Sequence, residues 1–187
     1  MRRLLALYAA AASAAVYKLD PDHTAVTFRV RHLVGHVTGQ FDKFDGIFVY
    51  DPKNPAVWRA SATIDASSID TRVAARDKHL RSSDFFDVEK YPTLTFVSTK
   101  AAQVRKGRAK LLGKLTIHGV TKPIALDLDI GGTEKDAGGN ERAAFTATGR
   151  IDRKKFGLTW NTYVESGGAL VGDQVDITIE AEGVRQK

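Results

Sequence analysis

The residues of this sequence that could carry acid–base, nucleophilic or metal chemistry are few and poorly grouped. Its five histidines are spread along the chain, and its lack of cysteine removes thiolate nucleophiles and cysteine metal sites. His32 and His36 are spaced like two metal ligands on a helix, but Gly35 separates them in a segment typical of a strand and a turn. Ser166 is followed by two glycines without the Gly-x-Ser-x-Gly pattern of a hydrolase. We therefore expect no catalytic centre, no metal site and no enzyme.

The charged residues are scattered along the chain rather than gathered into one binding surface. The formal net charge is +6, and the densest basic group is the short run from Arg153 to Lys155. Proteins that bind nucleic acid present longer basic stripes. We expect no nucleic-acid partner.

The N-terminal residues are typical of a signal peptide. Residues 1–3 are positively charged, residues 4–12 form a short apolar run, and Ala12-Ser13-Ala14 is a site of the kind that signal peptidase cuts. The apolar run is much shorter than the ~20 residues that cross a bilayer. We expect residues 1–14 to be removed and residues 15–187 to form one exported domain without a membrane span. An Ala-rich N-terminal helix of the folded domain is the alternative.

The elements that must position any functional residue are mostly strands, because apolar and polar residues alternate along the chain. Such alternation indicates antiparallel strands with a solvated outer face. A sheet of this size loses its exposed edges by closing on itself, so we predict an all-β, antiparallel barrel of about eight strands. A two-sheet sandwich is the alternative. The four strongest segments are 24–32, 124–130, 145–152 and 175–183, the weaker ones are 17–20, 37–41, 46–50, 58–65, 93–99 and 110–117, and a polar loop is expected at 131–141.

One segment breaks the strand pattern. Asp70 or Thr71 can cap a short helix over about residues 71–80, and the pair Phe85-Phe86 follows it. We expect the helix and this pair to close one mouth of the barrel. Alternatively, the two phenylalanines only anchor a loop to the rim, and Arg76 and Asp77 form an exposed ion pair worth about 0–1 kcal/mol. The polar residues nearest the mouth would be Arg76, Asp77 and His79.

Small residues on the expected inner faces raise the question of whether the barrel is filled or hollow. Protein interiors pack to a density of about 0.75, so a thinly lined barrel would leave an apolar space that suits a hydrocarbon. Glycines at barrel corners, with large residues opposite the alanines, would instead give a filled interior. The small residues are Ala60, Ala62, Gly113, Ala147, Gly149, Ala181 and Gly183.

If the barrel is hollow, its inward side chains contact the ligand. The alternation in segment 24–32 places Val26, Phe28, Val30 and His32 on one face. An inward His32 could bond a ligand head group, and a satisfied core histidine is the alternative. The candidate apolar contacts are Phe28, Val30, Phe48, Leu80, Phe85, Phe86, Phe96, Leu115 and Phe145, and the candidate head-group partners are His32, Arg76 and His79.

Four motifs, in order, resemble those of the YceI-like family of exported polyisoprenoid-binding proteins, over about residues 17–184. The resemblance implies a lipocalin-like, extended antiparallel barrel, commonly dimeric, with an isoprenoid chain in its interior. It also implies a bacterial periplasmic or secreted location. The motifs are DHTAVTF at 22–28, RDKHLRSSDFFD at 76–87 with YPTLTF at 91–96, GKLTIHGVTKP at 113–123, and GDQV at 172–175.

The resemblance implies a function in lipid binding. The ligand would be a polyisoprenoid or isoprenoid quinone-like lipid, held for transport, storage or stress protection, and no cofactor is expected. The expected partners are this lipid and a second copy of the chain, and transient contact with a membrane stays open. Two alternatives remain: a filled-barrel stress or interaction protein without a lipid ligand, and an enzyme on the same scaffold.

Overall fold

The computed structural model describes residues 14–163 and 169–187. All of the expected signal peptide except Ala14 lies outside these residues, and so does the glycine-flanked Ser166. The elements are β1 (Ala15–Leu19), β2 (Ala25–His32), β3 (Gly35–Phe41), β4 (Phe44–Tyr50), β5 (Arg59–Asp65), β6 (Ile69–Asp70), α1 (Ala74–Arg81), β7 (Thr93–Arg105), β8 (Arg108–Ile117), β9 (Val120–Lys135), β10 (Glu141–Asp152) and β11 (Val171–Arg185), with four short 3-10 turns between them.

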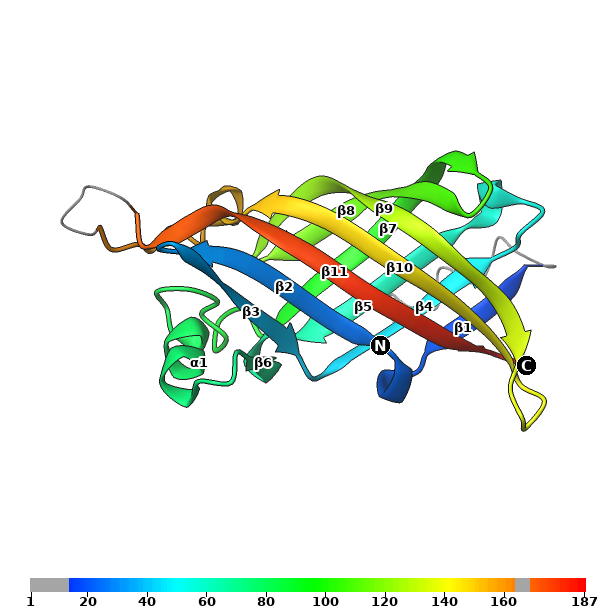
Figure 1. Cartoon of the computed structure of the whole chain (residues 1–187), viewed down its shortest axis with the longest axis horizontal. Helices are drawn as coiled ribbons and strands as arrows, with labels where there is room; N and C mark the ends of the chain where they lie inside the picture. The colour runs from blue at the N-terminus through cyan, green and yellow to red at the C-terminus, as the bar shows by residue number, and fades with distance from the viewer. Residues whose placement is uncertain (1–13, 164–168) are drawn as a thin grey trace.

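Eight of these strands close into an antiparallel barrel, which confirms the predicted fold and excludes the sandwich. The order around the barrel is β1-β4-β5-β7-β8-β9-β10-β11, and β11 then pairs with β1 to complete the ring (Figure 1). With 16 residues in β9, the longest wall is about 50 Å long at ~3.3 Å per residue, so the barrel is extended.

The pairing of the last strand, β11, distinguishes the two ends of the barrel. Along one edge, β11 pairs with β1 over residues 183–185 and with β2 over residues 171–180. Beyond β2 the sheet continues through β3 to the two-residue β6, and α1 follows β6 in the chain. We call these the β1 end and the α1 end; they lie at opposite ends of the long axis (Figure 1).

All ten predicted strand segments overlap observed strands, but the sequence pattern underestimates the length of eight of them. The predicted polar loop at 131–141 is partly wrong, because β9 runs on to Lys135. A register shift opposite Ala144 and Phe145 accommodates Gly131 as an extra residue, and Gly132 has a positive φ of 97° that suits glycine. Because of this bulge, β9 continues beyond Ile130, where the alternation of apolar and polar residues ends. The strand β6 was not predicted.

The helix begins three residues later than predicted, because its expected caps bond elsewhere. The side chain of Asp70 accepts a hydrogen bond from Arg72 N, and Thr71 bonds to the helix residue Asp77. Asp77 is buried and accepts from Thr71 N at 2.9 Å and from Thr71 Oγ1 at 2.5 Å, while Arg76 Nε donates to Thr71 Oγ1 at 2.7 Å. The alternative of an exposed Arg76–Asp77 ion pair is therefore wrong. Both side chains fasten the chain just before the helix.

Some of the small inward residues leave room for neighbouring side chains, as the filled-barrel alternative required. A Cβ added to Gly113 would lie 2.5 Å from the ring of Phe96, and one added to Gly183 would lie 2.5 Å from the ring of Phe48. These two glycines are thus covered by aromatic rings, and Gly149 is covered by the side chain of Leu126. The alanines are not filled in this way, and they border open space described below. Among the described residues no helix is long and apolar enough to span a bilayer.

Candidate ligand cavity

Two adjoining cavities occupy the interior of the barrel along its length. The larger, of about 190 Å³, lies toward the α1 end, and the smaller, of about 110 Å³, lies toward the β1 end. We call them the α1 chamber and the β1 chamber. An apolar cavity of about 150 Å³ stays dry and binds benzene, so this interior has room for a larger hydrocarbon. The two chambers share five lining residues: Leu19, Ala62, Phe96, Leu126 and Ile179.

The α1 chamber is lined by apolar atoms. Two residues with polar groups border it, but those groups are bonded to the backbone: Thr27 Oγ1 donates to Thr178 O at 3.0 Å. The second is Arg153, which is only 4% exposed. A ligand in this chamber therefore meets hydrocarbon, and its binding would depend on buried apolar area rather than on hydrogen bonds.

Arg153 fastens the two chain segments that border this chamber near its opening. Its guanidinium donates to Gly172 O at 2.9 Å, to Leu158 O at 2.6 Å and to Trp160 O at 2.8 Å. Burial removes water from around the charge and lowers the pKa of Arg153, while the carboxylate of Asp173, 3.7 Å away, acts in the opposite direction. This role could not be predicted from the sequence, because a basic run after a strand is usually solvated.

Every predicted apolar contact lies in the cavity wall. Segment 24–32 alternates as predicted, with Val26, Phe28 and Val30 facing inward. Their role in binding a ligand is a matter for experiment, but their placement follows from the two-residue period of a strand. The α1 chamber is bordered by Phe28, Val30, Leu80, Phe85, Phe86 and Leu115, the β1 chamber by Phe48 and Phe145, and both by Phe96.

The three predicted head-group partners lie outside the cavity wall. His32 is the last residue of β2 and pairs with Gly35 and Val171 at the rim, where the chain turns through Leu33 with a positive φ of 50°. Arg76 is engaged by Thr71, as described above. His79 Nε2 bonds to Asp84 Oδ2 at 2.8 Å on the outer side of the helix. None of the three side chains lines the interior, so contact with a head group would have to take place at the rim, and that role stays a prediction.

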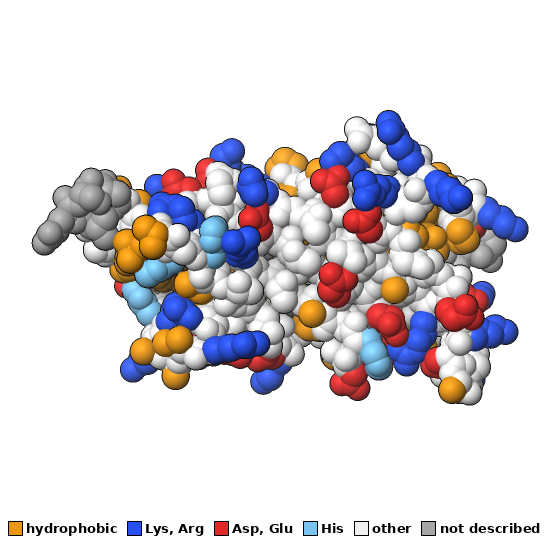
Figure 2. Space-filling view, viewed as in Figure 1, with side chains coloured by type: hydrophobic (Ala, Val, Ile, Leu, Met, Phe, Trp, Pro, Cys, Tyr) orange, Lys and Arg blue, Asp and Glu red, His pale blue; other side chains and the backbone are white. Residues whose placement is uncertain are grey.

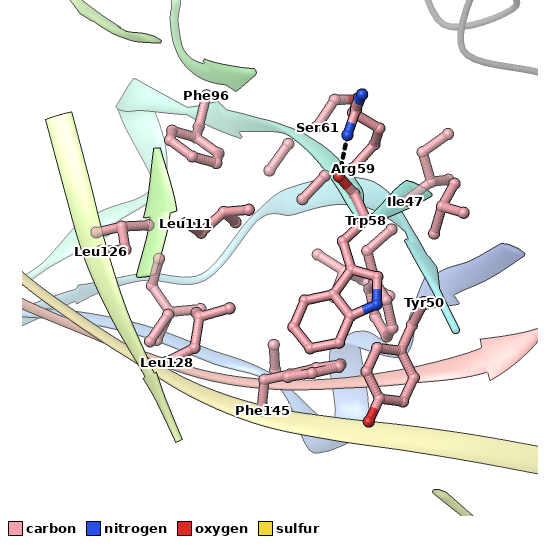
Figure 3. Close-up of a pocket in the computed structure, with 18 residues that line it drawn as sticks. Ile47, Tyr50, Trp58, Arg59, Ser61, Phe96, Leu111, Leu126, Leu128 and Phe145 are labelled. Atoms are coloured by element: carbon pink, nitrogen blue, oxygen red, sulfur yellow. Dashed lines mark hydrogen bonds between the residues drawn. The ribbon is translucent and has the colours of Figure 1, made fainter. Parts of the chain in front are cut away.

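The β1 end is closed by packed aromatic rings that the sequence analysis mostly missed. Tyr17 stacks on Phe48 with ring centroids 5.1 Å apart, Phe145 meets Tyr50 edge-on at 4.9 Å, and Tyr50 packs on Trp58 at 4.9 Å. Figure 3 shows Tyr50, Trp58 and Phe145 grouped beside the leucines of the β1 chamber. The signal in the sequence was Trp58, an aromatic residue three positions after the polar turn at 51–55.

The polar tips of these aromatic residues are bonded at the rim. Tyr17 Oη donates to Glu141 Oε1 at 2.5 Å, and Trp58 Nε1 donates to Asp51 O at 2.7 Å. Burial and the neighbouring Glu141 carboxylate raise the pKa of Tyr17, and burial raises the pKa of Tyr50. Each ring is therefore held by packing on one side and, for Tyr17 and Trp58, by a hydrogen bond on the other.

The α1 end is closed by a loop and a short helix instead. Phe86 meets Phe41 edge-on at 5.8 Å, and its N–H donates to Leu80 O at 3.0 Å. Outside them, His79 packs edge-on against both Phe85 and Trp160. The helix is tied to the barrel by Arg81, which donates to Ser67 O and Ile69 O, each at 2.7 Å.

One group of side chains in the described part of the chain has the spacing of a metal site. Asp20, His23 and Glu182 offer ligand atoms within 4.8 Å of one another at the β1 end. Arg142 already fills this position, because its Nη1 donates to Asp20 Oδ2 at 2.7 Å and to Glu182 Oε1 at 2.6 Å. The cluster is thus a network of ion pairs.

These features define an antiparallel β-barrel protein with an apolar internal cavity, closed differently at its two ends. The chain belongs to the YceI-like family: the model of the YceI-like domain matches residues 17–183. It is 44% identical over 184 residues to Protein YceI of Escherichia coli O157:H7, covering 96% of this chain and 92% of that protein.

Solved structures show the same barrel. The Campylobacter jejuni YCEI protein is 32% identical with a TM-score of 0.73, covering 84% of this chain and 90% of its own. A polyisoprenoid binding domain from Saccharophagus degradans, implicated in plant cell wall breakdown, has a TM-score of 0.65 at 16% identity, covering 91% and 98% of the two chains. The second likeness is one of fold.

Proposed function

We propose that this protein binds a long isoprenoid chain inside the barrel. The observation that carries the proposal is the α1 chamber, an apolar interior that continues past Phe96 into the β1 chamber. A family fold shared with a polyisoprenoid binding domain supports the choice of an isoprenoid over other hydrocarbons. Burial of apolar surface is worth roughly 25 cal/mol per Å², so an extended chain can bind without a polar anchor.

The geometry gives the proposed ligand a direction. Its tail lies toward the β1 end, where the lining of the chamber is mostly apolar. Its polar head lies at the α1 end, outside Leu80, Phe85 and Phe86, because a head group buried among apolar side chains without a hydrogen bond would cost several kcal/mol. The side chains that recognise the head group are therefore to be sought on the rim.

We further propose that the protein acts outside the cytoplasm as a carrier or store of such lipids. The support is the signal-like segment at residues 1–14 and the absence of cysteine, which fits an exported chain that folds without disulfides. The resemblance to the family also supports a homodimer, which light scattering of the purified protein would test.

The experiment is mass spectrometry of an organic extract of the protein, purified from a bacterial periplasm without detergent. We expect a stoichiometric prenyl lipid. Phe28→Asp, which places a charge in the α1 chamber, should lose the lipid, and the control Thr148→Asp places the same charge on the exposed outer face of β10. Because Phe28→Asp could unfold the protein, circular dichroism and a second variant, Ala147→Phe, accompany it. A clean wild-type extract that stays clean after incubation with isoprenoid quinones would overturn the proposal.

A further inference from the structure

Three exposed apolar side chains lie together on the rim of the α1 end. Val34 is fully exposed at the β2–β3 turn, Leu33 beside it is 40% exposed, and Tyr163 is 70% exposed. We call these three residues the rim patch. Large apolar side chains at the outermost point of a protein are unfavourable in water, so a group of them indicates a contact surface.

The rim patch is one continuous surface built from two distant chain segments. Leu33 N donates to Leu170 O at 2.9 Å, Leu170 N donates to Thr162 O at 2.8 Å, and Tyr163 pairs with Ala169. These bonds hold the β2–β3 turn against the segment that leads into β11. In Figure 2 apolar side chains gather at this end of the molecule.

The patch adjoins the α1 chamber. His32, next to Leu33, pairs with Val171, which follows Leu170 and lines the chamber together with Val30. An apolar path therefore runs from the rim patch along Val171 and Val30 into the interior. A molecule leaving the chamber here would pass directly onto whatever the patch contacts.

Cations outnumber anions beside the patch. Residues 25–41 and 153–163 contain no Asp or Glu, and Asp173, at the start of β11, pairs with Lys154 at 3.0 Å. They carry four exposed cations, Arg29, Arg31, Lys154 and Lys155, and Lys and Arg side chains lie near the apolar group in Figure 2. Arg31 itself donates to Leu33 O at 2.8 Å, so one cation is fixed at the base of the patch.

We propose that the rim patch docks the α1 end of the barrel on the surface of an anionic lipid bilayer, where the ligand enters or leaves. This inference rests on the proposed function, because lipid binding is what gives the protein a reason to contact a bilayer. Apolar side chains that insert among lipids, next to Lys and Arg that attract phosphate head groups, are the elements of peripheral membrane binding. A protein partner fits less well, since three side chains at a narrow tip are far from the ~800 Å² per partner of a stable protein interface.

The test is flotation of the full-length mature protein with lipid vesicles. We expect it to float with vesicles of equal parts phosphatidylglycerol and phosphatidylcholine, and to remain behind with phosphatidylcholine alone or at high salt. Val34→Asp should lower the partition coefficient about tenfold, because it removes one inserted side chain and adds a repelled charge. The matched control is Val104→Asp, an exposed valine at the other end of the barrel, which should bind like the wild type.

Mass spectrometry of the lipid extracted from each preparation distinguishes a failure of the docking inference from a failure of the proposed function. Lipid retained by a wild-type protein that does not float overturns the docking inference and leaves the proposed function intact. A protein that floats but carries no prenyl lipid, even after incubation, overturns the proposed function instead. Three other results would overturn docking on anionic lipid. The protein could float equally well with neutral vesicles, or Val104→Asp could reduce flotation as much as Val34→Asp does. The third result is self-association of the protein without vesicles that Val34→Asp abolishes.

Discussion

The two ends of the barrel close the same apolar interior by different means. At the β1 end, three strands and the segment at 51–58 bring aromatic rings into contact, and the polar tips of Tyr17 and Trp58 bond at the rim. At the α1 end, a helix of eight residues and a following loop cover the larger chamber, with Arg81 as a tie to the wall. The comparison indicates that the β1 end provides stability and that the α1 end provides access.

The largest expected effect is on stability at the β1 end. Trp58→Ala should lower the free energy of unfolding by about 3–5 kcal/mol, because it empties a closely packed site that cannot collapse. Phe85→Ala at the α1 end should cost less than half as much, since the loop around it can settle into the space. Chemical denaturation of both variants measures the difference. Equal losses in the free energy of unfolding would show that the two ends contribute equally to stability.

The next effect is on ligand length. Ala147 lines the β1 chamber, and Ala147→Phe should fill it. We expect affinity for long prenyl chains to fall at least tenfold, at ~0.8 kcal/mol per methylene no longer buried, while chains short enough to fit in the α1 chamber are unaffected. Competition binding with a series of chain lengths tests this, and Thr148→Phe on the outer face is the control. Equal loss for short chains would mean that the ligand does not lie along the barrel as proposed.

A smaller effect is expected on the rate of ligand release. Arg81→Met keeps the length of the side chain but removes its bonds to Ser67 O and Ile69 O. Each lost charged hydrogen bond is worth about 1.5–3 kcal/mol, part of which water restores at this half-exposed site. We expect release of a fluorescent prenyl ligand to accelerate several-fold and amide exchange in α1 to increase, with little change in overall stability. Unchanged exchange in α1 would argue against this helix as the moving part.

The smallest expected effect is on the stability of the fold at low pH. Hydrogen bonds from Arg142 are the main cause that lowers the pKa of Asp20 and of Asp136 to about 2, below an ordinary value of 3.8. Carboxylates with a lowered folded-state pKa stabilise the fold above the unfolded pKa and lose that contribution as the pH falls to the folded value. Stability should therefore hold down to about pH 4 and decline toward pH 2. Arg142→Met should flatten this decline, as followed by thermal unfolding across pH; an unchanged slope would assign the acid sensitivity elsewhere.

The barrel and its inward residues could be predicted from the sequence, whereas the polar contacts could not. Alternation fixes which side of a strand faces inward, so Phe28 and Val30 were placed correctly. The branch from β11 to β2, β3 and β6 depends on pairings between distant residues, which alternation does not encode. The candidate head-group residues lie outside the cavity wall for a local reason: Thr71 bonds to Arg76 and to Asp77, and Asp84 bonds to His79. A one-dimensional pattern does not show such bonds.

The strand β11 also sets when the barrel can form during synthesis. It lies at the C-terminal end of the chain and pairs with β10, β2 and β1, and Tyr17 meets Arg185 across the closing seam. A ring closed between residues so far apart in sequence has a high contact order, which slows folding. Until the last strand has left the ribosome, β1 and β2 each lack a partner along one edge. A nascent chain of this protein therefore stays open until β11 has been synthesised.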